Sequence, residues 1–471
     1  MLFLCSCIGA AQISIVGKIS DTAGAPIAFA NLAERGTQNG TTTDVNGIYK
    51  LIVADNAVLV ISYIGYRTAT VPVQNEVVIN VTLEEGDSLN EIVVTALGVR
   101  RQERELGYAV QTLNSDQIQK VKSVNLIDNL QGKIAGITVT PGATGVGSSS
   151  KITIRGEASF SNNNPLFIVD GTPINNNTIF NFTNEAAAGF QEVDFGNGAG
   201  EVNQDDIETI TVLKGPAAAA LYGTRASNGA VIIETKNAGK KKGLGISYNT
   251  SFFVDSAFKL PEFQNEYGQG NSGQFEYVDG LGAGVNDNIT YSWGPRLDQG
   301  TLIPQFDSPV TLPDGTVVRG GDTSLYNGLP ITATAFNSHP DNLRDFYNTG
   351  FTAINNIAMT DGFENGNYRL SFTDLRSESI IPGVDLDRQT VAAKLNFTPD
   401  DKTTIRASIN YVNSASGNRP SNGYGSENAN YSLVAWGPRS MNIDNLRNYW
   451  QPGLEGVQQY SFNYTFFDNP Y

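Results

Sequence analysis

The sequence predicts a mainly β protein in three successive parts: a small β-sandwich, an α+β domain and the first strands of a transmembrane antiparallel β-barrel. Three observations lead to this fold class. Residues 12–86 contain short β-prone runs separated by turn residues. Residues 113–238 mix helix-capping residues with strands and a hairpin. In residues 239–471, apolar and polar residues alternate along several long runs, as in strands with one apolar and one polar face.

The composition excludes several classes of function. A net charge of -16 without a basic stripe argues against nucleic-acid binding. One histidine and two cysteines exclude His-rich zinc sites and Cys/His nucleophile pairs. The glycine pattern of residues 268–273 has neither a strand before it nor a helix after it, so we interpret it as a loop. His339 is expected in a solvated loop. The sequence therefore predicts no enzyme, no cofactor and no metal site.

Residues 1–11 resemble the second half of a secretory signal peptide, because an apolar run precedes Gly9, Ala10 and Ala11. The run lacks a positively charged start. Both cysteines, Cys5 and Cys7, lie within it, so a cut before Gln12 would leave a mature chain without thiols. A lipoprotein cleavage site at Cys5 is the alternative, which the preceding leucine disfavours.

Strand-like runs in the sandwich region cover residues 15–20, 28–32, 47–53, 58–63 and 77–83. Turn residues separate them, including Asp44-Val45-Asn46-Gly47. This turn begins like a calcium loop but lacks the later ligands, so we predict a simple turn.

Residues 87–112 are predicted to form a linker around one short β-prone run, Glu91-Ile92-Val93-Val94-Thr95-Ala96, called the box segment below. Its few apolar residues cannot build a core, but its backbone can add as a strand to the sheet edge of another protein. The alternative is an ordinary edge strand of a neighbouring domain.

The next region, residues 113–238, changes from strands alone to strands with helices. Ser115 is expected to cap a short helix, and Ser123 a second one over 124–131 that ends at Gly132 or Gly136. Pro216 is expected to start an Ala-rich helix over 217–222 that Gly223 ends. Strands are predicted at 137–140, 151–155, 166–169, 207–213 and 230–235, with Asp170-Gly171 at a hairpin tip.

Beyond residue 239, four runs alternate with period two: 246–252, 368–372, 391–397 and 405–411. Their pattern is typical of transmembrane barrel strands, with lipid on the apolar side and a wet interior on the other. A soluble antiparallel sheet with one solvated face alternates identically. No apolar run reaches the roughly 20 residues of a membrane-spanning helix. The polar stretches 261–350 and 413–471 are expected to be extracellular loops or loop-rich hairpins.

Several motifs carry a resemblance to a known family. The sandwich resembles the carboxypeptidase regulatory-like domain in residues 16–21, 24–27, 40–44, 47–49 and 62–66. The box segment resembles the TonB box. Four motifs, residues 130–136, 154–156, 164–171 and 213–226, occur in the order found in the plug domain of TonB-dependent receptors. Together they look like the SusC/RagA family of nutrient importers. The candidate site residues in these motifs are Arg155, Gly156, Asp170, Gly171, Lys214, Gly215, Pro216, Tyr222, Gly223 and Arg225.

The resemblance implies an Ig- or transthyretin-like sandwich of about seven strands and a barrel of about 22 strands. Only about five to eight strands fit in residues 243–471, so we expect an N-terminal fragment of a longer protein. The resemblance also implies a bacterial outer-membrane location with a periplasmic N-terminal domain, and import of an oligosaccharide or a peptide.

The implied partners are TonB with its inner-membrane energising complex, a SusD-like surface lipoprotein and outer-membrane lipid. A binding or signalling receptor is the alternative function. Arg155 and Arg225 are hypothesised to form ion pairs that hold the plug, and exposed arginines bonded to polar loops are the alternative.

Overall fold

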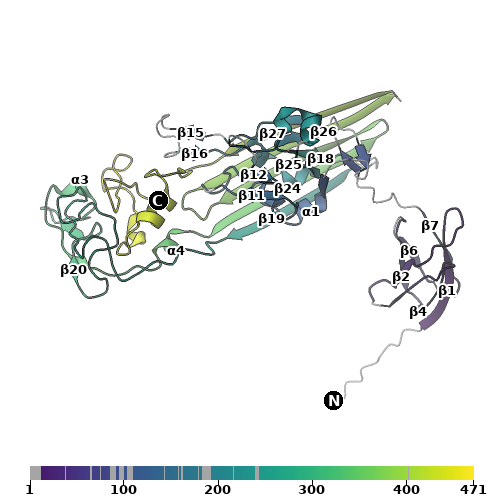
Figure 1. The fold of residues 1–471 in the computed structure, drawn as a ribbon, viewed down its shortest axis with the longest axis horizontal. Helices are drawn as coiled ribbons and strands as arrows, with labels where there is room; N and C mark the ends of the chain where they lie inside the picture. The colour runs from purple at the N-terminus through teal and green to yellow at the C-terminus, as the bar shows by residue number, and fades with distance from the viewer. Residues whose placement is uncertain are drawn as a thin grey trace, which may run out of the picture. The chain divides into compact units, whose positions relative to one another are not determined.

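The structure is a computed structural model, shown in Figure 1. It describes residues 12–37, 39–63, 66–74, 76–84, 92–94, 100–102, 110–142, 144–157, 159–160, 163–178, 180–182, 192–215, 217–238, 243–400 and 402–471. The chain divides into two compact units, residues 1–95 with 100–107 and residues 96–99 with 108–471. The predicted signal peptide, residues 1–11, lies outside the described residues.

The first unit contains a seven-stranded sandwich, and its mainly β character was predicted. A three-stranded sheet in the order β4-β1-β7 faces a four-stranded sheet in the order β3-β2-β5-β6. The strands are β1 (Gln12–Asp21), β2 (Asn31–Glu34), β3 (Gly40–Thr42), β4 (Ile48–Ala54), β5 (Val58–Ser62), β6 (Ala69–Pro72) and β7 (Val81–Leu83). The sequence did not predict β3 and β6, because each is short and neither contains a fully buried residue.

Two local features explain sequence motifs of the sandwich. The Asp44 side chain accepts hydrogen bonds from the backbone N–H groups of Asn46 (2.9 Å) and Ile48 (2.8 Å), and Gly47 has φ +77°, which confirms the predicted turn. At Gly17 the Ile79 backbone crosses β1 so closely that an added Cβ would lie 1.8 Å from the Ile79 carbonyl oxygen. Only glycine fits at that crossing.

The middle of the box segment forms a strand, β8 (Ile92–Val94), which pairs antiparallel with β9 (Arg100–Gln102). Glu91, Thr95 and Ala96 lie outside the described residues. The predicted extended conformation is therefore found for Ile92–Val94, although its backbone is paired locally and not free on both sides. In this two-stranded sheet β8 keeps one unpaired edge within the described part of the chain.

The second unit begins with an α+β region, residues 110–238, which we call the plug. Its five-stranded sheet has the order β10-β17-β18-β13-β14, with β13 and β18 parallel and the other neighbours antiparallel. Two small hairpins, β11-β12 and β15-β16, accompany it. The strands are β10 (Val110–Asn114), β11 (Ile137–Thr140), β12 (Lys151–Ile154), β13 (Leu166–Val169), β14 (Thr172–Ile174), β15 (Phe180–Phe182), β16 (Glu192–Asp194), β17 (Ile207–Leu213) and β18 (Ala230–Thr235).

The plug helices are short. They are α1 (Ser115–Gln119), α2 (Ala217–Tyr222) and the 3₁₀ turns η3 (Asp128–Leu130), η5 (Gly198–Glu201), η6 (Gln204–Asp206) and η7 (Thr224–Ala226). The strand predictions and the helix at 217–222 are confirmed. The cap of α1 is Asn114, which forms a capping box with Gln117, so the prediction of Ser115 was wrong.

The predicted helix over 124–131 was also wrong, since only η3 forms there. Asparagine side chains explain this, because they offer the backbone bonds that compete with a helix. Asn125 accepts from the Ile127 N–H at 3.0 Å, and buried Asn129 donates to the Ile118 carbonyl at 2.8 Å.

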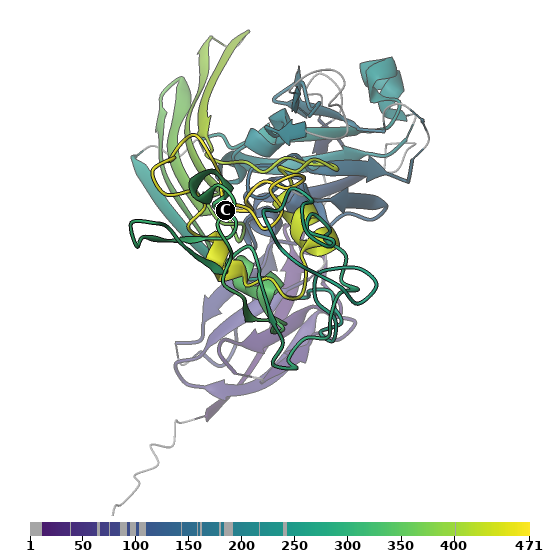
Figure 2. The same ribbon diagram turned by 90° about the vertical axis from the view of Figure 1, so that its left-hand side faces the viewer.

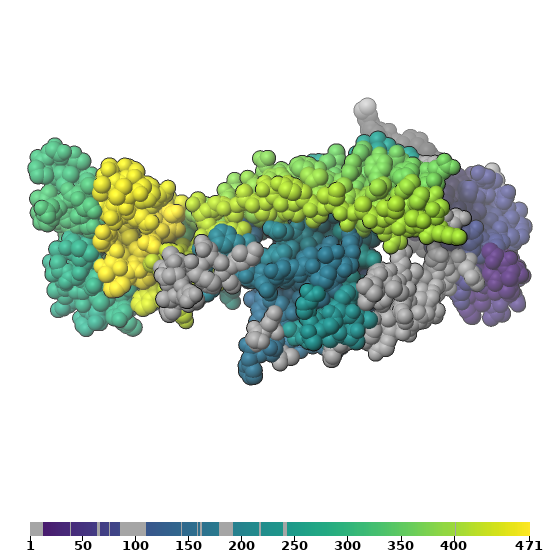
Figure 3. Space-filling model, turned by 90° about the horizontal axis from the view of Figure 1, so that it is seen from above, coloured from purple at the N-terminus to yellow at the C-terminus, as the bar shows by residue number. Residues whose placement is uncertain are grey.

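Five long strands form an antiparallel meander beside the plug, which we call the wall. In order they are β19 (Gly245–Asp255), β24 (Gly350–Phe363), β25 (Gly366–Glu378), β26 (Asp385–Asp400) and β27 (Thr403–Ala415). Figure 2 shows them as one curved layer, and in Figure 3 they lie along the plug. The sequence did not predict β24, because polar and apolar residues occur on both of its faces.

The wall has the opposite polarity to a soluble sheet. Along β25, Arg369, Ser371 and Thr373 are buried, whereas Leu370 and Phe372 are 42% and 44% exposed. The same division continues on β26, where the buried face carries Arg388 and Thr390 and the exposed face carries Val391 and Leu395. A soluble sheet buries its apolar face. These parts of β25 and β26 bury polar side chains and expose apolar ones, as a barrel strand does, whereas the edge strands β19 and β27 are largely exposed on both faces.

The two long polar stretches fold together into what we call the loop module, residues 256–349 and 416–471. Aromatic and aliphatic side chains from both stretches share one core, including Phe336, Phe346, Leu446 and Tyr460. The module lies at one end of the wall strands in Figure 1, where α3, α4 and β20 are labelled. The opposite end has only short connections, so the predicted long loops are all at one end.

Small elements complete the loop module. They are β20 (Leu302–Ile303), β21 (Pro309–Thr311), β22 (Val317–Arg319), β23 (Thr334–Ala335), α3 (Thr323–Tyr326), α4 (Asn342–Phe346), α5 (Ala429–Tyr431), the π-helix η8 (Ser432–Trp436) and η9 (Ile443–Leu446). His339 belongs to the first stretch and is half-buried, so the prediction that it is solvated was wrong. Within the described ranges, no helix is long and apolar enough to cross a membrane.

Candidate functional site

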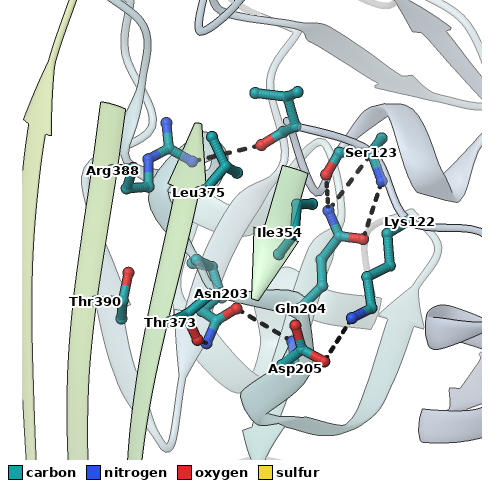
Figure 4. A pocket seen from close by; sticks show the side chains of 12 residues that line it. Lys122, Ser123, Asn203, Gln204, Asp205, Ile354, Thr373, Leu375, Arg388 and Thr390 are labelled. Atoms are coloured by element: carbon teal, nitrogen blue, oxygen red, sulfur yellow. Dashed lines mark hydrogen bonds and ion pairs between the residues drawn. The ribbon is translucent and has the colours of Figure 1, made fainter. Parts of the chain in front are cut away.

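The seam between plug and wall contains a turn with two consecutive carboxylates that point to different parts of the protein. The turn is η6, directly before β17, and the Asn203 side chain caps it by accepting from the Asp205 N–H at 3.2 Å. Figure 4 shows this turn beside the wall strands. Both carboxylates are buried, Asp205 at 1% exposed and Asp206 at 5%. A buried carboxylate requires a cation or several hydrogen-bond donors, and the two residues obtain them differently.

Asp206 binds the wall. Arg369 of β25 donates from Nη1 to Asp206 Oδ1 at 2.6 Å, and both side chains are 7% exposed. Ser371 Oγ donates to the same oxygen at 2.7 Å. Beside this pair, Asn203 Nδ2 donates to Asp206 Oδ2 at 2.6 Å and to Thr373 Oγ1 at 2.8 Å. We call the Asp206–Arg369 pair with these bonds the latch.

Asp205 binds the plug itself. Lys122 Nζ lies 2.7 Å from Asp205 Oδ1, with the two side chains 5% and 1% exposed. Asp205 Oδ2 is buried and has no hydrogen-bond partner within the described part of the chain. Lys236 Nζ donates to the Asp205 carbonyl at 2.9 Å. Burial lowers the pKa of Lys236, and the positive charge of Arg369 lowers it further.

Two further cations of the wall reach the plug. Arg388 of β26 donates from Nη1 to the Gly200 carbonyl at 2.6 Å and to the Val124 carbonyl at 3.4 Å. Lys394 of β26 pairs with Asp170 at 3.1 Å, at the tip of the β13-β14 hairpin. The wall therefore supplies positive charge, and the plug supplies carboxylates and carbonyl oxygens.

The seam is incompletely filled. A cavity of about 420 Å³ is lined by charged residues of both sides, including Asp170, Asp206, Lys236, Arg369 and Lys394. A smaller cavity of about 20 Å³, enough for one water, touches Lys122, Asp205 and Thr373. No three His, Cys, Asp or Glu side chains form a metal-binding group in the described ranges.

Of the candidate site residues, only Asp170 lies in the seam. Arg155 and Arg225 are exposed, and neither forms an ion pair with any described residue, so the hypothesis that they hold the plug through ion pairs is not supported. Lys214 donates to Gln111 at 3.1 Å, and its pKa is lowered by burial and then by the charge of Arg155.

The other candidate positions shape the plug. Gly171 at the hairpin tip and Gly223 at the end of α2 have positive φ, as do Gly156 and Gly215. Tyr222 packs at the edge of a small core around α2. Pro216 lies outside the described residues.

Sequence reasoning missed Lys122, Asn203 and Arg369. It considered the adjacent carboxylates Asp205 and Asp206 as acid–base groups, and preferred to place Asp206 at the start of the following strand. Two signals were present. The acidic pair stands directly before a strand of the plug, and Arg369 is the one cation among small polar residues on the inward face of β25. The residues of the Asp206–Arg369 pair are 163 positions apart, and nothing in a single sequence joins them.

Comparison with known proteins agrees with the domain order. Residues 15–94 match the family model described as the CarboxypepD_reg-like domain, and residues 102–230 match that of the TonB-dependent Receptor Plug Domain. "TonB-dependent receptor SusC" of Bacteroides thetaiotaomicron is 36% identical over 244 residues, which covers 51% of this chain and 23% of the relative. "TonB-dependent receptor P39" of Formosa agariphila is 37% identical over 229 residues, 48% of this chain and 20% of the relative.

A solved structure of the RagAB peptide importer in the "open-open" state aligns with a TM-score of 0.47 and 18% identity, over 71% of this chain and 33% of that one. The chain spans less than a quarter of the length of the two curated relatives. The mainly β fold class, with a regulatory-like sandwich, a plug and an antiparallel sheet, is confirmed. The chain therefore carries a CarboxypepD_reg-like domain followed by a TonB-dependent Receptor Plug Domain, and over these regions it is similar to SusC/RagA-type TonB-dependent receptors.

Proposed function

We propose that this chain is the gated part of an outer-membrane nutrient importer. The plug seals against the wall through the latch, and tension applied to the box segment opens the seal. The observation that carries the proposal is the polarity of the central wall strands: in residues 369–373 of β25 and 388–391 of β26, one face buries polar side chains and the other exposes apolar ones. An exposed apolar face suits lipid, and a polar interior suits a path for hydrated solutes.

The position of the loops supports an orientation. Long connections lie at one end of the wall and short ones at the other. In outer-membrane barrels the long loops are extracellular and the short turns periplasmic. The plug chain enters β19 at the end with short turns, since Gly245 pairs with Thr360 near the β24–β25 turn. In this orientation the chain passes from the plug into the wall at the periplasmic end.

The proposed energy source is a partner that binds the box segment. The curated relatives are TonB-dependent receptors, and β8 keeps one free edge in its two-stranded sheet. TonB would add a strand to that edge and pull. A SusD-like lipoprotein would capture the oligosaccharide or peptide at the loop module, and transport would need no catalysis by this chain.

Deletion of residues 91–96 tests the proposal in the full-length protein. We expect nutrient uptake to be lost while ligand still binds at the cell surface. A matched pair of variants distinguishes a requirement for backbone pairing at the box segment from a requirement for a particular side chain. Val93→Pro removes a backbone N–H donor and should abolish uptake, whereas Val93→Ile keeps the strand and should preserve it.

Uptake that survives the deletion would refute the gating proposal. If uptake survived and a transcriptional response to the nutrient were lost, the alternative of a signalling receptor would be supported.

A further inference from the structure

We propose that the Lys122–Asp205 pair is the coupling that passes tension from the box linker to the latch. The inference rests on the proposed function and goes beyond it, because it assigns the opening step to an ion pair inside the plug that is separate from the Asp206–Arg369 pair. Three structural steps lead to it: a connection from the linker to Lys122, an attachment of Lys122 to η6, and the attachment of η6 to the wall.

The first step is a continuous stretch of secondary structure. The linker ends at β10, an edge strand whose only neighbour in the sheet is β17. Asn114, the last residue of β10, is also the cap of α1, so strand and helix follow each other without a loop. Ile118 fixes α1 in the plug core at 1% exposure. Displacement of β10 along its axis therefore moves α1, and with it Lys122 immediately beyond.

The second step is the attachment of this segment to η6. Lys122 holds the Asp205 carboxylate, and Gln119 Nε2 donates to the Asp205 carbonyl at 3.3 Å. Gln204 Nε2 donates to the Ser123 carbonyl at 2.6 Å, as Figure 4 shows. These contacts join the start of the plug to a turn more than 80 residues later in the chain.

The third step is the shortness of η6. Asp205 and Asp206 are adjacent, so Asp205 cannot shift far without moving Asp206 away from Arg369. The link between α1 and η6 comprises a buried ion pair and hydrogen bonds from the Gln119 and Gln204 amides, and the link to the wall comprises a buried ion pair and hydrogen bonds to Ser371 and Thr373. The two attachments are in series through η6, so tension that arrives through α1 also loads the attachment to the wall.

The surroundings of Asp205 leave room for its side chain to move. Among the described residues its Oδ2 is buried without a hydrogen-bond partner, and the Asp205 residue lines the small cavity that Thr373 of the wall also lines. A side chain held on one oxygen, next to an unfilled volume, can shift without first displacing packed atoms. Asp206, by contrast, accepts bonds on both oxygens.

The test distinguishes a role of the Lys122–Asp205 pair in opening the plug from a role in holding the plug closed. The variant is Lys122→Met with Asp205→Asn, which removes both charges together and leaves no unpaired ion in the plug. In the full-length protein we expect uptake to fall about tenfold, a size typical of lost coupling between sites. Entry of a large antibiotic through the outer membrane should stay at the wild-type level, and cross-linking of TonB to the box segment should be unchanged.

Lys120→Met is the matched control, because Lys120 is exposed on the same segment and carries the same charge. It should import normally. Wild-type uptake in the double variant would overturn the proposal. So would antibiotic entry equal to that of Arg369→Met, because Asp205 would then belong to the seal.

Hydrogen exchange of the β17 amides reports whether the double variant is folded. If exchange is raised throughout the plug, Lys122→Arg provides the second measurement, since it keeps the charge and must restore uptake relative to the double variant. Failure of the gating function is recognised separately, by uptake that survives deletion of residues 91–96 in the wild-type background.

Discussion

Replacing Arg369 with methionine should loosen the plug from the wall. The substitution keeps an unbranched side chain but removes the guanidinium, so Asp206 stays buried with only Ser371 and Asn203 as donors. Both partners of the ion pair are 7% exposed, so solvent screens the interaction little. Removing one partner of such a buried pair costs about 3–5 kcal/mol.

Hydrogen exchange measures this cost directly. A loss of 3–5 kcal/mol corresponds to roughly 10²–10⁴-fold faster exchange of the amides that the latch protects, those of η6 and the first residues of β17. Arg376→Met on the same strand is the control, because Arg376 is 71% exposed on the outward face and pairs with Asp374. An exposed pair contributes little, so the control should change exchange by less than about fivefold.

A second substitution tests whether the unpaired buried charge of Asp206 causes the faster exchange. Arg369→Met combined with Asp206→Leu leaves no buried charge at the latch, and replacement of a buried ion pair by apolar groups is close to neutral. The double variant should therefore recover most of the protection. Wild-type exchange in Arg369→Met, or no recovery in the double variant, would refute the assignment of the latch.

Three further predictions concern the other parts of the chain. Gly17→Ala should lower the stability of the sandwich by about 1–3 kcal/mol, read as a lower melting temperature, because its Cβ would meet the Ile79 carbonyl oxygen. Phe372→Lys should reduce insertion into lipid vesicles by about 2–4 kcal/mol, whereas Val317→Lys in the loop module should not. Burial lowers the pKa of His339, so the imidazole binds a proton less well in the folded loop module than in the unfolded chain. The stability of the loop module, followed by limited proteolysis, should therefore fall as the pH drops below about 6.5. His339→Asn should remove this pH dependence.

Local patterns explain why much of the fold could be predicted. Alternation along β25 and β26 predicted both strands, because polar and apolar residues alternate over residues 368–373 and 391–397. Asn46-Gly47 and Asp170-Gly171 predicted the two turns.

Other elements depend on contacts that a single sequence does not contain. β24 was missed because Ile354 faces inward and Asn355 outward, which breaks the alternation. The helix expected over 124–131 fails because Asn129 bonds Ile118 and Gln204, both distant in sequence. The latch pairs a turn of the plug with a strand far along the chain, and only the folded structure brings them together.

Fixing the plug to the wall tests the central claim most directly. Asn203→Cys and Thr373→Cys place two thiols where the native side chains lie 2.8 Å apart, in a background with Cys5 and Cys7 replaced by serine. The two thiols are joined as a disulfide or through a short reducible linker. If the plug must leave this seam for import, the joined protein takes up no nutrient and the reduced protein recovers. Equal uptake in the joined and reduced states would contradict the account.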